Sequence, residues 1–459
     1  MKLEEQRAAQ ERQQNANEHE LFGTGESGLS DNEDHEGGPD KDDEGDDKIE
    51  ESESDRIWDE YIDGDFDQKA AVLEKTIDDP NLLEKFDCFE LFHELHESCR
   101  HFNDRQVFKK LTQRLKQEYP DRYKKVQGYL IQSLIQDALI EQNKTEAGKM
   151  FLEFADDADK DIDSFNRTLE QIAFDVDLDL LLSAMRRGWE KVKDSPEIVP
   201  WGIDEYANLA AEYAILKHVS EVPNPDATDS DLLKELEQFI DPDVEKLKTY
   251  LAHITGTSGK VWKSDDFNFQ IKRRKEKKAK RRPKDPGEKR LSIETFSMNV
   301  HHFTSEFLGY YVRKEGVSFP KAETARSELR RYLIDRAQGE LEAEPSMFEK
   351  IMQPELKNKK KQPPSFDHIL CPDKKTLDVF IGKMLNFFSF KLFRAVIFFA
   401  SIPAWLQFLE IKGLIEQEMR RNTMSSVFEL FADIRNVIES ESKDKDRLIT
   451  YIEKAYSRR

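Results

Sequence analysis

The chain has 459 residues, of which 37% are hydrophobic and 36% charged, and its formal net charge is −22. This composition is too polar for one compact globule throughout, but 30 Phe, 12 Tyr and 5 Trp residues suffice for a sizeable core. Three cysteines exclude a disulfide framework in so long a chain and are typical of a reducing compartment. Met1 to Gln6 lack the apolar stretch of a signal peptide, so we expect a cytoplasmic protein, or a nuclear one in a eukaryote.

Residues 1–55 are expected to be a disordered acidic arm. Between positions 31 and 55 there are 14 Asp and Glu residues against two Lys, a local net charge of −12. Ordering such a segment costs backbone entropy and buries almost no apolar surface in return. We interpret it first as a solubilising tail. The alternative is an arm that binds a basic partner or folds back on residues 272–290.

Residues 56–258 are predicted to be a succession of amphipathic helices. After Pro120, apolar residues such as Val126, Leu130 and Leu134 recur with the helical period of 3.6 residues. Prolines at positions 80, 120, 200 and 242 each precede such a pattern, and Asp161 opens another. No segment has the convincing alternation of a strand, so the predicted fold class is all-α.

The spacing of these helix starts resembles that of tetratricopeptide and HEAT-like repeats. The steps between the prolines are 40, 80 and 42 residues, close to the length that a pair of helices with turns requires. The resemblance is architectural, and it implies an α-solenoid-like array that carries protein partners. The Trp, Gly, Tyr and Ala signature of tetratricopeptide units is not met, so no binding residue is carried over. An irregular helical bundle is the alternative.

One segment of this array holds the candidate metal ligands. Cys88, His93, His96 and Cys99 include the thiol and imidazole groups that zinc prefers. Four ligands on one straight helix are strained geometrically, and Cys88, Phe92, Leu95, Cys99 and Phe102 share the spacing of a single buried stripe. We therefore predict no metal site here and interpret the cysteines as core residues.

Residues 259–291 are predicted to be a basic linker. Positions 272–290 hold 12 Lys and Arg residues against three Asp and Glu, a net charge of +9. The candidate polyanion-binding residues are Lys272, Arg273, Arg274, Lys275, Lys277, Lys278, Lys280, Arg281 and Arg282. They are suited to neutralise phosphates, and the nearby Trp262, Phe267 and Phe269 to stack on bases. A plain linker, a nuclear localisation signal and a partner for the acidic arm are the alternatives.

Two smaller helical units are predicted to follow. A block over residues 292–353 contains one helix from Ser292 to Gly316 and a second from Pro320 to Gln338, which carries several Arg residues. That second helix is either a basic reader of nucleic acid or, as we favour, a bundle helix with a solvated basic face. A polar linker spans residues 354–368.

The C-terminal domain, residues 369–459, is the most apolar part of the chain. Ser401 and Pro403 are expected to begin a helix that ends at Gly413, and another helix is expected from Met424 to Ile438. Lys391 and Arg394 interrupt the apolar run over 384–409, which favours buried core over membrane contact or insertion. Residues 368–373 and 403–415 resemble a module of large uncharacterised bacterial proteins, which implies no activity.

The sequence therefore predicts an architecture and leaves the function open. It contains no phosphate-binding loop, dinucleotide fingerprint or nucleophile elbow, and we assign no catalytic residue, no cofactor and no small-molecule substrate. A non-enzymatic protein-interaction scaffold is the leading hypothesis. A nucleic-acid-associated protein acting through residues 272–290 is the alternative, and an enzyme with an unrecognised site is the third.

Overall fold

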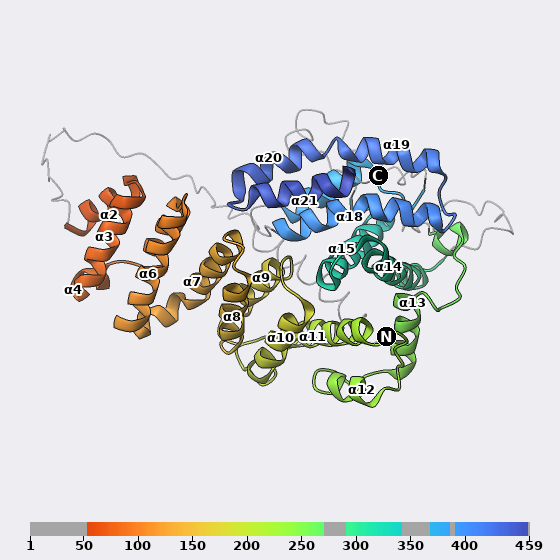
Figure 1. Cartoon of the computed structure of the whole chain (residues 1–459), viewed down its shortest axis with the longest axis horizontal. Helices are drawn as coiled ribbons and strands as arrows, with labels where there is room; N and C mark the ends of the chain where they lie inside the picture. The colour runs from red at the N-terminus through yellow and green to blue at the C-terminus, as the bar shows by residue number, and fades with distance from the viewer. Residues whose placement is uncertain (1–52, 270–290, 342–367, 386–390, 458–459) are drawn as a thin grey trace, which may run out of the picture. The chain divides into compact units, whose positions relative to one another are not determined.

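The structure, a computed structural model, describes residues 53–269, 291–341, 368–385 and 391–457, and all of its regular elements are helices (Figure 1). No strand occurs among these residues, which confirms the all-α prediction. The acidic segment 1–52 and the candidate polyanion-binding residues 272–282 lie outside the described residues.

The described helices are taken in three groups along the chain. The first group comprises α2 (Glu53–Asp63), α3 (Phe66–Asp78), α4 (Pro80–Lys85), α5 (Cys88–Ser98), α6 (Phe102–Glu118) and α7 (Pro120–Ile140). The second comprises α8 (Lys144–Ala155), α9 (Ile162–Ile172), α10 (Leu178–Val192), α11 (Pro200–Glu221), α12 (Ser230–Leu236), α13 (Val244–Thr255) and a short 3₁₀ helix, η1 (Ser264–Phe267). The third comprises α14 (Ile293–Glu315), α15 (Phe319–Gln338), α17 (Lys374–Met384), α18 (Leu392–Ile411), α19 (Gln417–Phe428), α20 (Phe431–Glu441) and α21 (Lys445–Ser457).

The helix starts predicted at Asp161 and after the four prolines are confirmed. Pro80, Pro120 and Pro200 each occupy the first turn of a helix, where the missing N–H has no intrahelical partner to lose. The Asp161 carboxylate caps α9 by accepting a hydrogen bond of 3.0 Å from the Ser164 amide. After Pro242 the helix begins at Val244, with the side chain of Asp243 as its cap.

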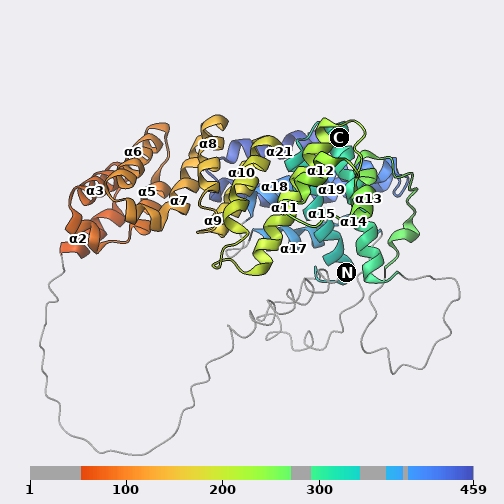
Figure 2. The ribbon, with the colours of Figure 1, turned by 90° about the horizontal axis from the view of Figure 1, so that it is seen from below.

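The described helices form two hydrophobic cores that meet in α7. The first core lies between Tyr61 and Leu130, and the second runs from Ile131 to Tyr456. Leu130 therefore packs in the first core, whereas Ile135 and Leu139 on the same helix pack in the second. In Figure 2, α2 and α3 lie at one end of this series of helices, α7 lies in its middle, and α10 and α11 lie beyond α7.

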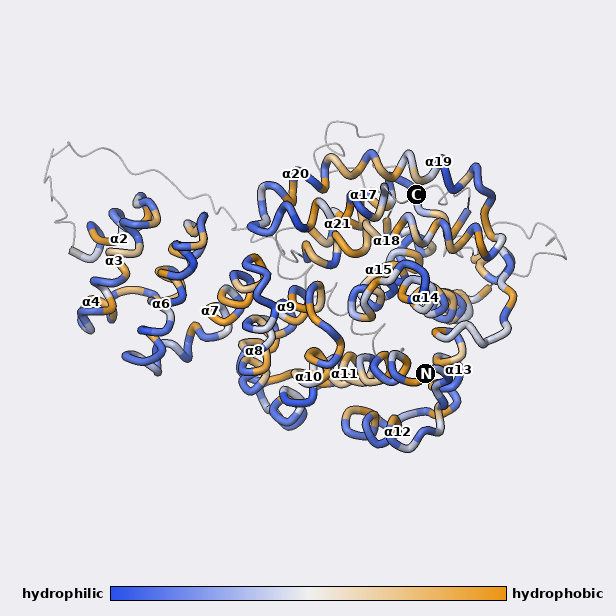
Figure 3. Tube along the Cα trace, viewed as in Figure 1, coloured by the Kyte–Doolittle hydropathy of each residue, from blue (hydrophilic) through white to orange (hydrophobic). Residues whose placement is uncertain are grey.

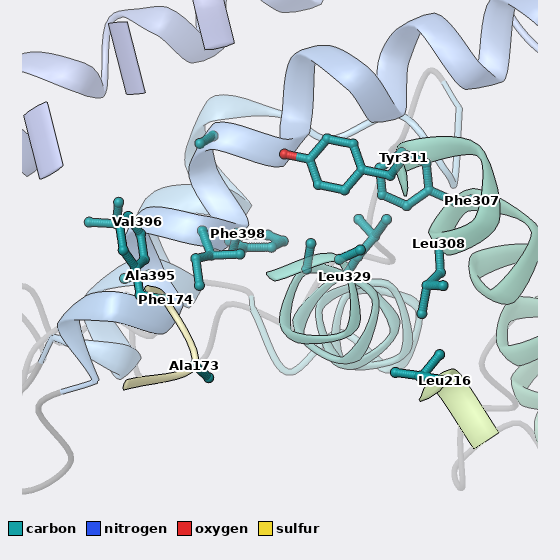
Figure 4. Packing of buried hydrophobic residues seen from close by; sticks show 14 of the residues in the cluster. Ala173, Phe174, Leu216, Phe307, Leu308, Tyr311, Leu329, Ala395, Val396 and Phe398 are labelled. Carbon is teal, nitrogen blue, oxygen red and sulfur yellow. The ribbon is translucent and has the colours of Figure 1, made fainter. Parts of the chain in front are cut away.

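The second core contains the most hydrophobic helix, α18. Figure 3 shows hydrophobic residues along its length, where it packs against α14, α15, α19 and α21. In Figure 4, Val396 of α18 lies beside Phe174, which precedes α10. Phe398 of α18 lies on the side of Leu329 of α15. Helix α18 is long and apolar enough to cross a membrane, but 83% of its most apolar window is buried inside the protein.

The predicted helix start at Ser401 is wrong, because α18 continues through Ser401 and Pro403. Proline has no N–H, so it cannot bond the carbonyl four residues earlier, which belongs to Phe399. The Tyr456 hydroxyl of α21 donates a hydrogen bond of 3.3 Å to that carbonyl instead. A side chain distant in sequence thus satisfies the acceptor that the proline leaves open, and the helix does not end there.

This compensation predicts a coupled pair of substitutions. Tyr456→Phe removes the donor and leaves the Phe399 carbonyl buried without it, which costs about 1 kcal/mol of unfolding free energy in urea. In the Pro403→Ala background the restored backbone N–H occupies the carbonyl, so the same substitution should cost less than half as much. Equal costs in the two backgrounds would contradict the role given to Tyr456.

The single helix predicted from Met424 to Ile438 is also wrong, because α19 ends at Phe428 and α20 begins at Phe431. The Phe428 and Phe431 rings stack across the break at 5.5 Å. Val427, Ile434 and Ile438 are all buried, and their spacing remains helical across the break. The hydrophobic pattern therefore could not reveal the interruption.

Arg336 of α15 holds the segment that precedes α17. Its Nη1 donates to the carbonyls of Ile369 at 2.7 Å and Cys371 at 2.6 Å, and its Nη2 lies 2.9 Å from an Asp373 oxygen. The Trp405 indole N–H donates to the Leu370 carbonyl at 2.9 Å. Residues 368–373, which the sequence singles out, are thus fixed by a buried guanidinium and an indole.

A lysine cannot reproduce this planar, multiple donation, so Arg336→Lys should lower the unfolding free energy by roughly 2–3 kcal/mol. The matched control is Arg435→Lys, because the side chain of Arg435 is 49% exposed and pairs with Glu439 on the surface. Urea titrations should show the control within about 0.5 kcal/mol of wild type. If both variants lose the same small amount, Arg336 does not hold the segment.

Candidate functional site

Helix α5 separates the two cysteines considered as metal ligands. Cys88 is its first residue and Cys99 is its C-cap, and both are buried free thiols. Eleven residues of α-helix correspond to a rise of roughly 16 Å, too far for one ion. In the described part of the chain, no three or more His, Cys, Asp or Glu side chains are arranged to hold a metal ion.

The two histidines between these cysteines have partners on α7. His93 Nδ1 shares a hydrogen bond of 3.2 Å with the Tyr129 hydroxyl, and His96 Nε2 lies 3.3 Å from an Asp137 carboxylate oxygen. Lys443, between α20 and α21, donates to the His96 carbonyl at 2.5 Å. His96 is 2% exposed. Its contacts with Asp137 and Lys443 therefore join α5, α7 and the C-terminal helices, and its ring does not face solvent.

The thiol of Cys99 is not suited to nucleophilic chemistry. Burial, followed by the nearby Asp137 carboxylate, raises its pKa to about 12. The thiolate is the reactive form of cysteine, and the Cys99 thiol is protonated at neutral pH. We therefore interpret Cys99 as a structural residue of the core. The predicted buried stripe is confirmed for Cys88, Phe92, Leu95 and Cys99 but not for Phe102, which begins α6 and is 55% exposed.

The aromatic residues that precede the basic segment are engaged in the core. Trp262 and Phe267 are buried, and their rings lie 5.4 Å and 5.2 Å from the ring of Phe303 on α14. Phe269 packs on Phe296 at 5.4 Å. In this arrangement Trp262 and Phe267 are not available to stack on bases.

Helix α15 belongs to a bundle as predicted, but most of its basic face is not solvated, and Arg331 is the exposed exception among its arginines. Arg326 is buried, and its guanidinium makes two hydrogen bonds of 2.6 Å to Glu323. Arg336 is buried as well, and Lys321 lies over the Phe174 ring at 4.2 Å. These cations therefore point at protein groups, and α15 does not present them as a reader of nucleic acid.

Sequence analysis missed the most concentrated polar site, which surrounds Glu306 of α14. One carboxylate oxygen accepts hydrogen bonds from His253 at 2.9 Å, Ser258 at 3.1 Å and Trp262 at 2.9 Å. The other accepts from Lys412 at 2.6 Å, directly after α18. The four donors come from α13, the segment after it and the end of α18, so one side chain joins three parts of the chain.

The site is continuous with a second buried group of charges. The His302 ring stacks on His253 at 4.5 Å, and the neighbouring His301 lies 3.3 Å from a guanidinium nitrogen of Arg326. Burial lowers the pKa of His301 to about 2, so its ring is neutral. The sequence feature that could have revealed this site is the His301–His302 pair, followed one helical turn later by Glu306. The spacing of apolar residues contains no information about these polar side chains.

Close helix packing supports this site. Gly309, on the next turn of α14, lies against the carbonyl of Ile254 in α13, where an added Cβ atom would approach to 1.8 Å. Arg313 Nη1 donates to the same carbonyl at 2.7 Å. The C-terminal end of α13 is thereby held on α14, which places His253 beside Glu306.

The chemistry of Glu306 is that of a permanent anion. Burial raises its pKa, but hydrogen bonds from His253, Lys412 and Trp262 outweigh burial and lower it from 4.5 to about 2. A group with that pKa does not exchange protons near neutral pH, so it is a poor general acid or base. We therefore interpret the centre as a buried anchor for the segment between α13 and α14.

This pKa predicts how stability depends on pH. Because the folded value is lower than the unfolded one, Glu306 stabilises the protein above about pH 4.5 and loses that effect as the pH falls toward 2. Glu306→Gln should lower the free energy of unfolding by roughly 3 kcal/mol at pH 7. At pH 3 the difference in unfolding free energy between wild type and the variant should be smaller by roughly 2 kcal/mol. Denaturant unfolding of both proteins at both pH values measures this difference.

The control for this experiment is Glu439→Gln, because that carboxylate is 44% exposed and pairs with an exposed arginine. Its effect should stay below about 1 kcal/mol at both pH values. A gap between wild type and Glu306→Gln that is the same at pH 7 and pH 3 would show that the charge of Glu306 does not stabilise the fold.

A partly exposed cluster of rings, here called the aromatic surface, is formed by Phe89 and His93 of α5 and Tyr129 of α7. The Phe89 and His93 rings are stacked with an interplanar angle of 4° and a centroid distance of 5.6 Å. Tyr129 meets Phe89 edge-on at 5.0 Å. Phe89 is 43% exposed, so the cluster offers a large apolar side chain to solvent in a fixed orientation.

Comparison with models of known protein families, with curated proteins and with solved structures gives no significant match to the chain.

Proposed function

We propose that the chain is a non-enzymatic protein-interaction scaffold built on a helical-repeat array over α2–α13. The order of helix contacts supports this proposal. Helix α5 packs on α6 and α7, α7 packs on α8 and α9, and α8 packs on α9 and α10. Contacts with the next helix and the next but one are typical of solenoids, in which each unit buries its apolar face against its neighbours.

The single observation that carries the proposal is the sharing of α7 between two cores. A helix at the edge of a closed globule would bury one stripe in one core. Instead, the buried apolar residues of α7 up to Leu130 belong to one core and those from Ile131 onward belong to the other, while the partly buried Leu134 still packs on the first. The array thus continues through α7, and continuation of this kind creates the extended surfaces that solenoids use to bind partners.

The distribution of charge along the array also favours a binding function. Residues 53–98, which span α2–α5 and their connections, hold 15 acidic and four basic residues, a net charge of −11. Helices α6 and α7 hold four acidic and eight basic residues, a net charge of +4. Segregated charge steers the approach and orientation of charged partners. The three free, buried cysteines are consistent with the reducing cytoplasmic location that we propose.

Affinity purification of the tagged full chain from its native cells tests this function against the nucleic-acid alternative. We expect specific protein partners that survive nuclease treatment of the extract. We also expect a variant lacking residues 272–282 to retain them, because the array rather than the basic segment binds them. Loss of every protein partner after nuclease treatment would contradict the scaffold and favour association through nucleic acid.

A further inference from the structure

The aromatic surface has the properties of a binding hot spot. Phe89 is held between the His93 ring and the edge of Tyr129, and the hydrogen bond between His93 and Tyr129 fixes the other two rings. A ring that is already ordered loses little conformational entropy when a partner covers it. Aromatic side chains held in this way contribute a large share of binding energy at protein interfaces.

The surroundings of the rings determine which partner fits. Glu90 on α5 is exposed beside Phe89, and Glu97, one turn after His93, is exposed and lies 3.6 Å from Lys443 Nζ. Acidic residues also outnumber basic ones on α2 and α3. Arg122 and Lys125 of α7 lie near Cys88 at one edge of the rings, but residues 53–98 together carry a net charge of −11, which repels nucleic-acid phosphates and anionic lipid headgroups. The field of this acidic span attracts Lys and Arg side chains and accelerates their approach.

We propose that the aromatic surface is the docking site for a basic segment of a partner protein, which places one apolar side chain against Phe89 and Tyr129. The Lys and Arg residues of that segment face the carboxylates of α2–α5. This proposal deepens the scaffold function and rests on it, because it identifies one surface of the array and the class of its partner. The apolar contact provides specificity, and the charges provide attraction over distance.

The test uses the full chain and a defined probe. The probe is a fluorescein-labelled helical peptide of about 18 residues made of Lys and Leu with one central Trp, and binding is measured by fluorescence anisotropy. We expect Phe89→Ala to weaken binding by about tenfold or more, which corresponds to roughly 1.4 kcal/mol, and Phe89→Tyr to retain it. Circular dichroism verifies that each variant has the helical content of wild type.

The matched control is Phe428→Ala. Phe428 on α19 is 45% exposed and stacks on another aromatic ring, but it lies outside the acidic helices. The control should bind the probe as wild type does. A second peptide has the same number of Lys residues and Ser in place of Leu and Trp. It should bind at least tenfold more weakly in 150 mM salt, where the Debye length is about 8 Å.

Two results would overturn the proposal: unchanged affinity of Phe89→Ala, or equal affinity for the peptide that lacks apolar residues. Either result would show that the peptide binds through nonspecific charge attraction. Failure of the docking proposal is distinguishable from failure of the scaffold function. Nuclease-resistant partners that remain bound to Phe89→Ala would leave the scaffold standing and remove this surface from it, whereas the absence of any such partner would remove the scaffold itself.

Discussion

A buried charge requires a partner, and in this protein the partners lie on helices that are distant in the sequence. Arg394 of α18 pairs with Glu328 of α15 at 2.8 Å and with Glu170 of α9 at 2.9 Å. Glu328 is 1% exposed, so leaving its carboxylate unpaired costs several kcal/mol, whereas the side chains of Arg394 and Glu170 are partly exposed. Helices α9, α15 and α18 therefore have to assemble together, and the same constraint applies to the parts joined by Glu306.

This constraint explains how so highly charged a chain builds a large core. Arginine and glutamate are used inside the bundle as connectors between helices, where a smaller protein would use only apolar contacts. The cations of α15 are consequently occupied by protein groups. The proposed interaction surface lies on other helices, α5 and α7, and its exposed ring belongs to Phe89.

Much of the fold could be predicted from the sequence because helix starts depend on local chemistry. Pro120 and Asp161 mark helix starts by the groups they lack or supply, and the structure confirms both. The continuous α18 could not be predicted, because the hydrogen bond that allows Pro403 inside it comes from Tyr456, which lies far along the chain. The inward orientation of Arg326 and the role of Glu306 could not be predicted either. Amphipathic patterns assign charged residues to the surface, and the partners that hold these two side chains inside are not adjacent to them in the pattern.

We infer that buried charges couple distant helices into one cooperative unit. Hydrogen–deuterium exchange of the full chain, followed peptide by peptide in increasing denaturant, measures this coupling. We expect α9, α14, α15 and α18 to exchange through one opening with a common free energy close to that of global unfolding. If α15 opens and exchanges at much lower denaturant than α18, the ion pairs between them do not couple the helices.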